Sequence, residues 1–232
     1  MKKFFVLFAL LSAFSVTVVA QEANQLDKDS QTSVKPVSED MRTIQLGCDL
    51  ARYGYSNKSA SALIEAARLL SSVTIQPATD ERSVEGEGKA NEGKKHSAVS
   101  YDPNQILKDA KKYAGKDKTL LALADQVEKS MSTTHRGSIV GAKTIRDCVR
   151  GNTTDVWKCR FRGGETALVI VVGDGDTDLD LYIYDENDRL IECDLDNTDN
   201  CVCSWTPKWT GSFTIKIKNR GSITNCYSYY HN

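Results

Sequence analysis

The spacing of apolar residues changes near residue 144, and this change organises the chain. Upstream of it, apolar residues recur every three or four positions, as on one face of a helix. The first two stripes follow Ser38, lie on either side of a turn at 54–58 and predict an αα-hairpin. Their members are Met41, Ile44, Cys48 and Ala51, then Leu63, Ile64, Ala67 and Leu70.

Two further helices are predicted later in the same half. Asp102 and Pro103 form a strong helix start, because the carboxylate caps free N–H groups and proline is tolerated at the first helical position. A break at 115–117 separates this helix from the last one. The four helices form a small unit, residues 38–132, which we expect to pack on itself; a platform for a partner is the alternative. Residues 79–100 are glycine-rich, charged and aperiodic, and predict a disordered loop within the unit.

Downstream, the period becomes two and predicts an antiparallel β-sandwich or jelly-roll, residues 144–232. The apolar run 167–172 and the alternating strand after it predict a sheet with one face on a core and the other in water. The predicted strands are 144–150, 155–161, 166–172, 178–184, 189–193, 201–206, 212–219 and 224–230. The inward set is Trp157, Cys159, Phe161, Leu179, Leu181, Ile183, Trp205, Phe213, Ile215 and Ile217. The whole chain is therefore predicted to be α+β.

The N-terminus predicts export. Residues 1–20 begin with two lysines, continue with an apolar run and end with Val18 and Ala20 at signal-peptidase spacing. The apolar run is too short to span a bilayer, so we expect no transmembrane segment. Cleavage near Ala20 would leave residues 21–37, which are polar and aperiodic, as a disordered tether in the periplasm or outside the cell. Lys plus Arg is 30 against 31 for Asp plus Glu, a balance that argues against nucleic acid as a partner.

Seven cysteines in an exported chain predict disulfides, and their odd number leaves at least one unpaired within the molecule. Cys193 and Cys201 flank a short loop between neighbouring predicted strands, so a bridge that closes this loop is the first expectation. The other cysteines leave two bridges open, one between the halves of the chain and one in the sandwich core: Cys48 to Cys148, and a pair among Cys159, Cys203 and Cys226.

Acidic residues crowd between positions 174 and 199. Carboxylates held close together repel one another unless a cation lies among them, and Ca²⁺ with its six to eight oxygen ligands is a natural neutraliser. An EF-hand is excluded, because Leu179 stands where that loop requires glycine. The candidate Ca²⁺ ligands are Asp174, Asp176, Asp178, Asp196 and Asp199. The alternative is a solvated acidic edge that keeps the sheet from pairing with other chains.

Three aromatic residues are candidate ligand contacts. Trp209 lies in a turn and suits stacking on a sugar ring or a partner peptide, unless it folds over the end of the sandwich. Tyr182 and Tyr184 alternate with the inward residues of their strand and therefore face outward. Enzyme motifs such as G-x-S-x-G and H-E-x-x-H are missing from the sequence, and its three histidines lie far apart along the chain. We therefore predict no catalytic activity.

The order of motifs after residue 144 resembles the bacterial pre-peptidase C-terminal domain, a secreted β-sandwich module. The motifs stand here as Asp155-Val156-Trp157-Lys158-Cys159, Gly164-Glu165, Ala167 to Val172, Asp178-Leu179-Asp180-Leu181-Tyr182, Trp205-Thr206-Pro207, Thr210-Gly211-Ser212-Phe213 and Tyr227 to Tyr230. Trp157 and Phe213 replace tyrosines of the family pattern, and the helical half is not covered. The resemblance implies a non-catalytic binding or accessory role outside the cytoplasm. A partner or inhibitor of a secreted peptidase and a carbohydrate-binding module are the alternatives.

Overall fold

The computed structural model describes residues 22–27, 34–88, 101–131 and 142–232. The predicted signal peptide at 1–20 lies outside these residues. Among the helices described, none combines the length and the apolar character needed to cross a bilayer. The described chain contains four helices and two five-stranded sheets, so the predicted α+β class is confirmed.

The first and third helices begin at the caps that the sequence predicts. Ser38 Oγ accepts a hydrogen bond from the N–H of Met41, and Asp102 Oδ1 accepts one from Asn104. The first helix extends through most of the predicted turn at 54–58. It ends only at Asn57, and Lys58 is its left-handed C-cap. The helices are α1 (Glu39–Asn57), α2 (Ala60–Ser72), α3 (Pro103–Ala114) and α4 (Lys118–Met131).

The strands form two sheets, which we call the inner and the outer sheet. The inner sheet has the order β1-β3-β10-β5-β8 and the outer sheet β2-β4-β9-β6-β7. All pairings are antiparallel except that of β1 with β3. The strands are β1 (Gln76–Pro77), β2 (Glu81–Glu85), β3 (Lys143–Val149), β4 (Thr154–Phe161), β5 (Ala167–Val172), β6 (Leu179–Tyr184), β7 (Leu190–Asp194), β8 (Asn200–Trp205), β9 (Gly211–Asn219) and β10 (Asn225–His231). The eight predicted strands are present, with ends shifted by one residue at most.

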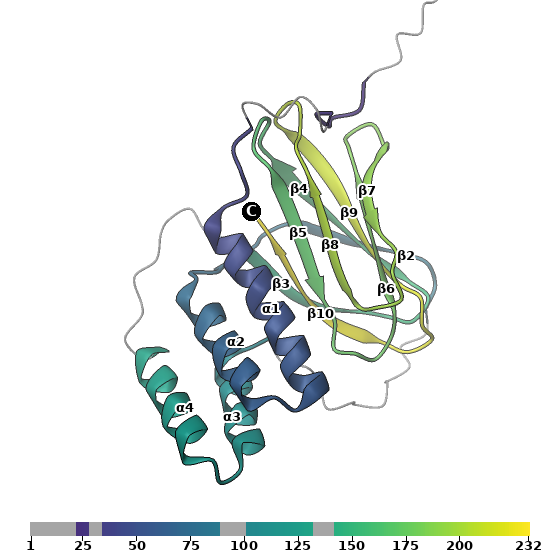
Figure 1. Cartoon of the computed structure of the whole chain (residues 1–232). Helices are drawn as coiled ribbons and strands as arrows, with labels where there is room; N and C mark the ends of the chain where they lie inside the picture. The colour runs from purple at the N-terminus through teal and green to yellow at the C-terminus, as the bar shows by residue number, and fades with distance from the viewer. Residues whose placement is uncertain (1–21, 28–33, 89–100, 132–141) are drawn as a thin grey trace, which may run out of the picture.

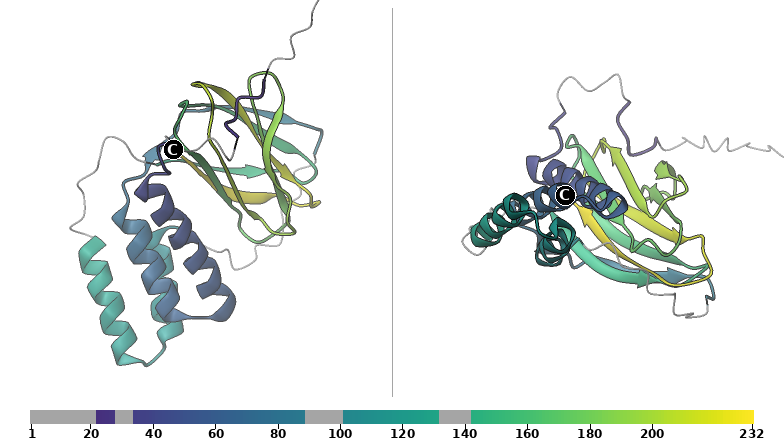
Figure 2. Two further views of the ribbon diagram at one scale, coloured as in Figure 1. Left: turned by 45° about the horizontal axis from the view of Figure 1, so that its top comes forward. Right: turned by 60° about the horizontal axis from the view of Figure 1, so that its bottom comes forward.

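The molecule has three layers, with the helices on one face of the inner sheet and the outer sheet on the other (Figures 1 and 2). One apolar core lies between the two sheets and contains every residue of the predicted inward set. A second core joins the helices to Leu168, Ile170, Val172 and Tyr230 of the inner sheet. All six residues of β5 are buried, so the expectation that this sheet has one face in water is wrong.

Two strands come from the helical half of the chain. β1 extends the inner sheet beside β3, and β2 extends the outer sheet beside β4. The prediction that residues 79–100 form a disordered loop is therefore wrong for 81–85, and residues 89–100 lie outside the described chain. The reason is that β2 reads Glu-Arg-Ser-Val-Glu and is exposed at every position, so it carries no alternating pattern.

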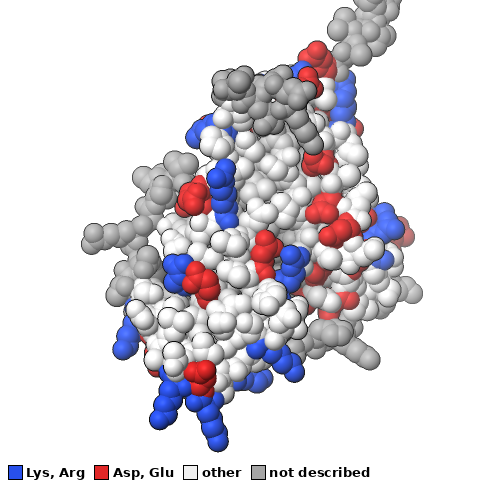
Figure 3. Space-filling view, in the orientation of Figure 1, with Lys and Arg blue, Asp and Glu red and all other residues white. Residues whose placement is uncertain are grey.

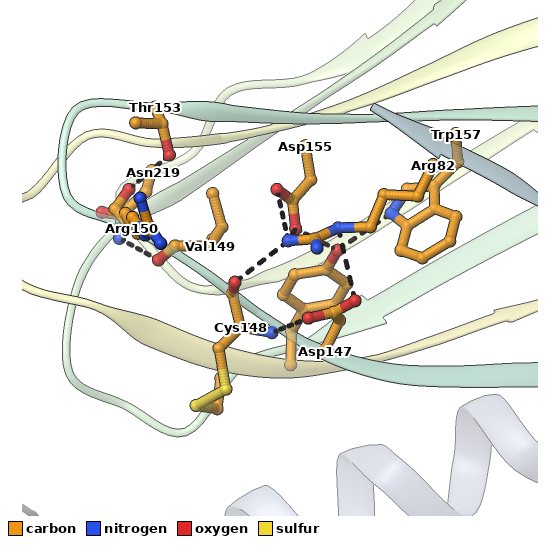
Figure 4. Close-up of polar contacts among 11 residues, drawn as sticks. Arg82, Asp147, Cys148, Val149, Arg150, Thr153, Asp155, Trp157 and Asn219 are labelled. Atoms are coloured by element: carbon orange, nitrogen blue, oxygen red, sulfur yellow. Dashed lines mark hydrogen bonds and ion pairs between the residues drawn. A yellow bond between two sulfur atoms is a disulfide. The ribbon is translucent and has the colours of Figure 1, made fainter. Parts of the chain in front are cut away.

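A buried polar network holds β2 on the sandwich (Figure 4). Arg82 Nη2 lies 2.9 and 3.0 Å from the two carboxylate oxygens of Asp155, and Arg82 Nε lies 3.3 Å from Asp147. Tyr227 donates to Asp155 at 2.7 Å and accepts from the Trp157 indole at 2.9 Å. Burial raises the pKa of Asp155, which is 1% exposed, and the hydrogen bonds from Tyr227 and Arg82 oppose that shift. The guanidinium therefore neutralises a charge that the sandwich has removed from water.

The one disulfide joins Cys148 of β3 to Cys226 of β10, which face each other in the register of the inner sheet. The predicted Cys193–Cys201 bridge is wrong, because both residues are free cysteines. Cys201 lies on β8 of the inner sheet, whereas Cys193 lies on β7 of the outer sheet. The predicted link from Cys48 to Cys148 is also wrong, and Cys48 is buried as a free thiol.

The described parts of the predicted tether are docked on the sandwich. Residues 22–27 contact the turns at one end of it, and Asn24 is fully buried there. Lys35 forms an isolated bridge with Glu165. The prediction of a disordered tether over 21–37 is therefore wrong for these residues, because hydrogen bonds rather than apolar burial hold them.

The network predicts a pH-dependent cost for losing Arg82. Arg82→Met keeps an unbranched side chain but leaves the Asp155 carboxylate buried without its cation, so we expect a loss of about 2 kcal/mol at neutral pH, below the range for fully buried pairs. Because the folded-state pKa of Asp155 is raised, its protonation begins above the ordinary Asp range, and the loss should shrink as the pH falls through that value. Urea denaturation at several pH values measures it. Arg52→Met removes an arginine from an exposed pair and is the control; an equal loss in both variants would contradict the prediction.

Candidate ligand-binding face

The outward side chains of the outer sheet form an open face. The register aligns Ser83, Val156, Lys216, Tyr182 and Cys193 in one cross-strand row. The next row is Glu81, Lys158, Thr214, Tyr184 and Leu190. These positions alternate with residues of the core between the sheets, and no described helix packs on them, since the helices lie against the inner sheet (Figure 2). The face is therefore available to a ligand.

Two tyrosines form the aromatic part of this face. The rings of Tyr182 and Tyr184 have centroids 6.4 Å apart and an angle of 23° between their planes. Lys216 Nζ lies 5.5 Å from the Tyr184 ring centroid and also binds Glu85 at 2.8 Å. Side by side, the rings offer an apolar surface with a cation and hydroxyls at its rim.

A fixed acidic group lies next to the tyrosines. The Tyr182 hydroxyl donates to Asp180 Oδ2 at 3.1 Å, and Arg220 lies 3.5 Å from the same oxygen. Burial raises the pKa of Tyr182, and Asp180 adds to this shift because a phenolate there would face the carboxylate. The phenol is thus held neutral and oriented, so its ring position is set by a contact within the face.

Trp209 does not lie on this face. It occupies the loop between β8 and β9, is 40% exposed, and its indole N–H donates to Glu186 Oε1 at 2.6 Å. Its backbone N–H donates to Asn24 Oδ1, and its carbonyl accepts from Asn24 Nδ2. The structure therefore places together two of the three predicted aromatic contacts and assigns the third to the end of the sandwich.

Most carboxylates of the acidic loops accept hydrogen bonds from neighbouring parts of the chain. Asp174 accepts hydrogen bonds from the N–H groups of Cys226 and Asp176, Asp199 accepts one from Gly175, and Asp196 accepts two from Thr198. Across the described ranges, no group of three or more Asp, Glu, His or Cys side chains is arranged to hold a metal ion. Figure 3 shows acidic side chains over the sandwich, on the right of the view. The carboxylates are thus engaged mainly by N–H donors.

Asp178 is the exception among the five aspartates. Its Oδ1 is buried without a hydrogen-bond partner, as is Oγ1 of the neighbouring Thr177. Burial raises the pKa of Asp178, and the negative charge of Asp180 raises it further, while Arg220 acts in the opposite direction. Asp178 therefore carries an ionisation cost at neutral pH.

Most free thiols are closed to reagents. Cys48, Cys159, Cys201 and Cys203 are buried, whereas Cys193 is partly exposed beside Tyr182. Burial raises the pKa of Cys159 to about 12 and also raises the pKa of the other three buried thiols. The only free cysteine with access to solvent thus lies on the open face.

His231 forms a buried pair that resembles part of a catalytic dyad. Its Nε2 lies 2.7 Å from Asp80, in the connection between β1 and β2, and its ring stacks on Tyr229 at 5.1 Å. The imidazole is completely buried, so a substrate has no route to it. The pair joins the β1–β2 connection to the end of β10; the other two histidines, His96 and His135, lie outside the described residues.

The sequence missed two polar residues of these sites. Lys216 alternates with core residues and was identifiable as outward-facing, but its place over Tyr184 depends on the pairing of β6 with β9. Asn24 lies in a polar stretch with no signal for docking. Both positions follow from strand and turn contacts between distant parts of the chain.

Comparisons with known proteins give only distant likenesses. No family model and no curated protein matches the chain. Among solved structures, a mitogen derived from Yersinia pseudotuberculosis matches with 16% identity and a TM-score of 0.34, over 40% of this chain and 86% of that one. The pre-peptidase C-terminal domain of a collagenase from Bacillus anthracis matches with 14% identity and a TM-score of 0.32, over 38% of this chain and 87% of that one. Scores this low do not establish a family.

Replacing Asp178 tests whether the acidic loops need a cation. Asp178→Asn removes the negative charge of this half-buried carboxylate and its repulsion from Asp180, so without added metal we expect about 0.5 kcal/mol of extra stability at neutral pH. Because the folded-state pKa of Asp178 is raised, the wild-type residue becomes protonated as the pH falls, and the difference should fade. Thermal melting with EDTA and with CaCl₂ measures both effects. A calcium-dependent rise in the wild-type melting temperature that Asp178→Asn abolishes would contradict the expectation that the loops need no cation, and would support the calcium hypothesis.

Thiol counting tests the disulfide assignment. Without reductant, we expect five thiols after denaturation, since only Cys148 and Cys226 are bridged. In the native protein only Cys193 should react rapidly with a maleimide, because the other thiols are buried. Mass spectrometry of labelled peptides identifies the site, and Cys193→Ser is the control that should abolish native labelling. Three thiols after denaturation would indicate a second bridge.

Proposed function

We propose that the chain is an exported, non-catalytic binding protein whose ligand surface is the open face of the outer sheet. One observation carries this proposal: Tyr182 and Tyr184 lie side by side on the face that no described element covers. The opposite face of the sandwich is closed by helices and has no comparable surface to offer. Export is supported by the composition of residues 1–20.

We infer that the ligand is a carbohydrate. Sugar rings present flat C–H surfaces that stack on aromatic side chains, and their hydroxyls bond with polar groups at the rim. Tyr182 and Tyr184 supply the stacking surface, and Lys216 and Thr214 lie in the same two cross-strand rows as donors. A solvent-exposed sheet face suits an extended polysaccharide better than a small molecule, because an open face cannot enclose a small ligand but can contact several sugar units in a row.

The likeness in motif order to the pre-peptidase C-terminal domain supports an accessory role of the same kind. In this interpretation the sandwich holds the protein on a glycan surface, and the helices brace the inner sheet. Calcium stays a separate hypothesis, supported by the acidic sequence and by the two unpaired oxygens of Asp178 and Thr177.

The tyrosine pair gives a direct test on immobilised polysaccharides and a glycan array. If the rings stack on sugar, Tyr182→Ala and Tyr184→Ala should each weaken binding roughly fivefold, and the double variant more strongly, at about 1 kcal/mol for each lost ring. Tyr53→Ala is the matched control, because Tyr53 is 58% exposed on α1, away from the face. If the wild-type protein binds none of the glycans, the carbohydrate proposal is rejected. Binding of the wild-type protein to a purified secreted peptidase would instead favour the peptidase alternative.

A further inference from the structure

A second, independent site lies at one end of the sandwich, where the β6–β7 turn and the β8–β9 loop meet. Residues 22–27 lie there against the β6–β7 turn and the β8–β9 loop (Figure 1). The side chain of Asn24 is at the centre of the contact and is completely buried. Since these groups belong to turns, the site shares no residue with the tyrosine face.

The Asn24 carboxamide forms two hydrogen bonds with the backbone of the β8–β9 loop. Its Oδ1 accepts from the N–H of Trp209 at 3.1 Å, and its Nδ2 donates to the carbonyl of Trp209 at 3.2 Å. The same Nδ2 lies 3.2 Å from Glu186 Oε2, and the backbone N–H of Asn24 donates to Asp185 Oδ2 at 3.1 Å. Aspartate would lose both Nδ2 donor bonds, so this set of partners specifies an amide of this length.

The neighbours of Asn24 are also recognised. Lys208 Nζ binds the carboxylate of Glu22 at 2.8 Å, and Arg189 donates to the Glu22 carbonyl at 2.6 Å. Ala23 packs on the core between the sheets. The N–H of Leu26 donates to the carbonyl of Thr206 at 2.8 Å. The bound sequence is therefore an acidic residue, a small residue and an asparagine. The chain bends at Asn24, where the N–H of Gln25 donates to the carbonyl of Ala23 at 2.8 Å.

The receptor side is built by the sandwich itself. Asp185 is 1% exposed, and its second oxygen accepts from the N–H groups of Asn187 and Arg189, which fixes the turn. Gly211 leaves room for the ligand, because a Cβ at this position would lie 2.8 Å from Asn24 Nδ2. The bonds of Asp185 with Asn187 and Arg189 do not involve the segment, so the turn has hydrogen bonds of its own that hold the receptor side.

The segment adds little to the fold. It joins neither sheet, and both apolar cores are complete without it except for the partly buried Ala23. Loss of the segment would return the N–H and carbonyl of Trp209 and the carbonyl of Thr206 to water. These are the groups that an incoming peptide would bind.

We propose that this end of the sandwich is a peptide-binding site for a segment with the sequence acidic–small–Asn that bends at the asparagine, and that residues 22–26 are its tethered, blocking occupant. Backbone capture of this kind binds peptides through main-chain bonds and uses one or two side chains for specificity. A tethered segment competes at an effective concentration in the millimolar range, so a free peptide binds only after the tethered one is weakened.

The test adds a labelled peptide of residues 21–27 to the full-length protein and follows fluorescence anisotropy. Asn24→Ala in the protein weakens the tethered copy, and we expect it to bind the wild-type peptide at least about tenfold more tightly than the wild-type protein does. The matched control is the same peptide with Asn24→Ala, which should not bind. Adding Gly211→Ala to the Asn24→Ala protein should abolish binding, because the new methyl group would lie 2.8 Å from the amide nitrogen of the bound asparagine, which is closer than the two groups can approach.

Three results would overturn the proposal: no binding to the Asn24→Ala protein, equal binding to the wild-type protein and this variant, or binding that survives Gly211→Ala. Circular dichroism and a cooperative melt first establish that each variant is folded. If Asn24→Ala is not folded, Glu22→Lys takes its place, since it sets a cation against Lys208 and leaves Asn24 intact. The same three results then apply to that variant.

Discussion

The burial of β5 on both faces determines the architecture. Its five large apolar residues, from Leu168 to Val172, each contribute roughly 1.5–3 kcal/mol when fully removed from water, so neither face can stay exposed. The outer sheet covers one face and the helices cover the other, which makes the helical half part of the same fold rather than a separate platform. One broad sheet surface is then left for recognition, and it is the face that carries Tyr182 and Tyr184.

Polar contacts, rather than apolar burial, attach the N-terminal segments to the sandwich. Arg82 fixes β2 to the sandwich through Asp155, Asp80 meets His231 at the end of β10, and Asn24 closes the turns at the sandwich end. In each case a residue from the first hundred positions pairs with the second half of the chain, and at least one partner is completely or almost completely buried. Because a buried polar group without a partner is costly, these contacts specify where the N-terminal segments return.

The sequence predicted those parts of the fold that have a periodic pattern. The eight strands after residue 144 and the inward set from Trp157 to Ile217 follow from alternation, and the outward tyrosines follow from the same rule. The segment 81–85 and Asn24 escaped prediction because they are held by ion pairs and amides, which leave no period in the sequence. The disulfide escaped for a related reason: Cys148 and Cys226 are 78 positions apart and meet only through the β3–β10 register, whereas Cys193 and Cys201 are close in sequence but lie on different sheets.

The same alternation also separates binding from stability. Leu181 and Ile183 are completely buried, and a one-residue slip of β6 would expose both of them while burying Tyr182. The core therefore fixes the position of the tyrosine platform with more energy than a ligand contributes through one stacked ring. Residues of the open face can consequently change without loss of the fold, so that ligand specificity can diverge on this face while the inward positions stay constrained.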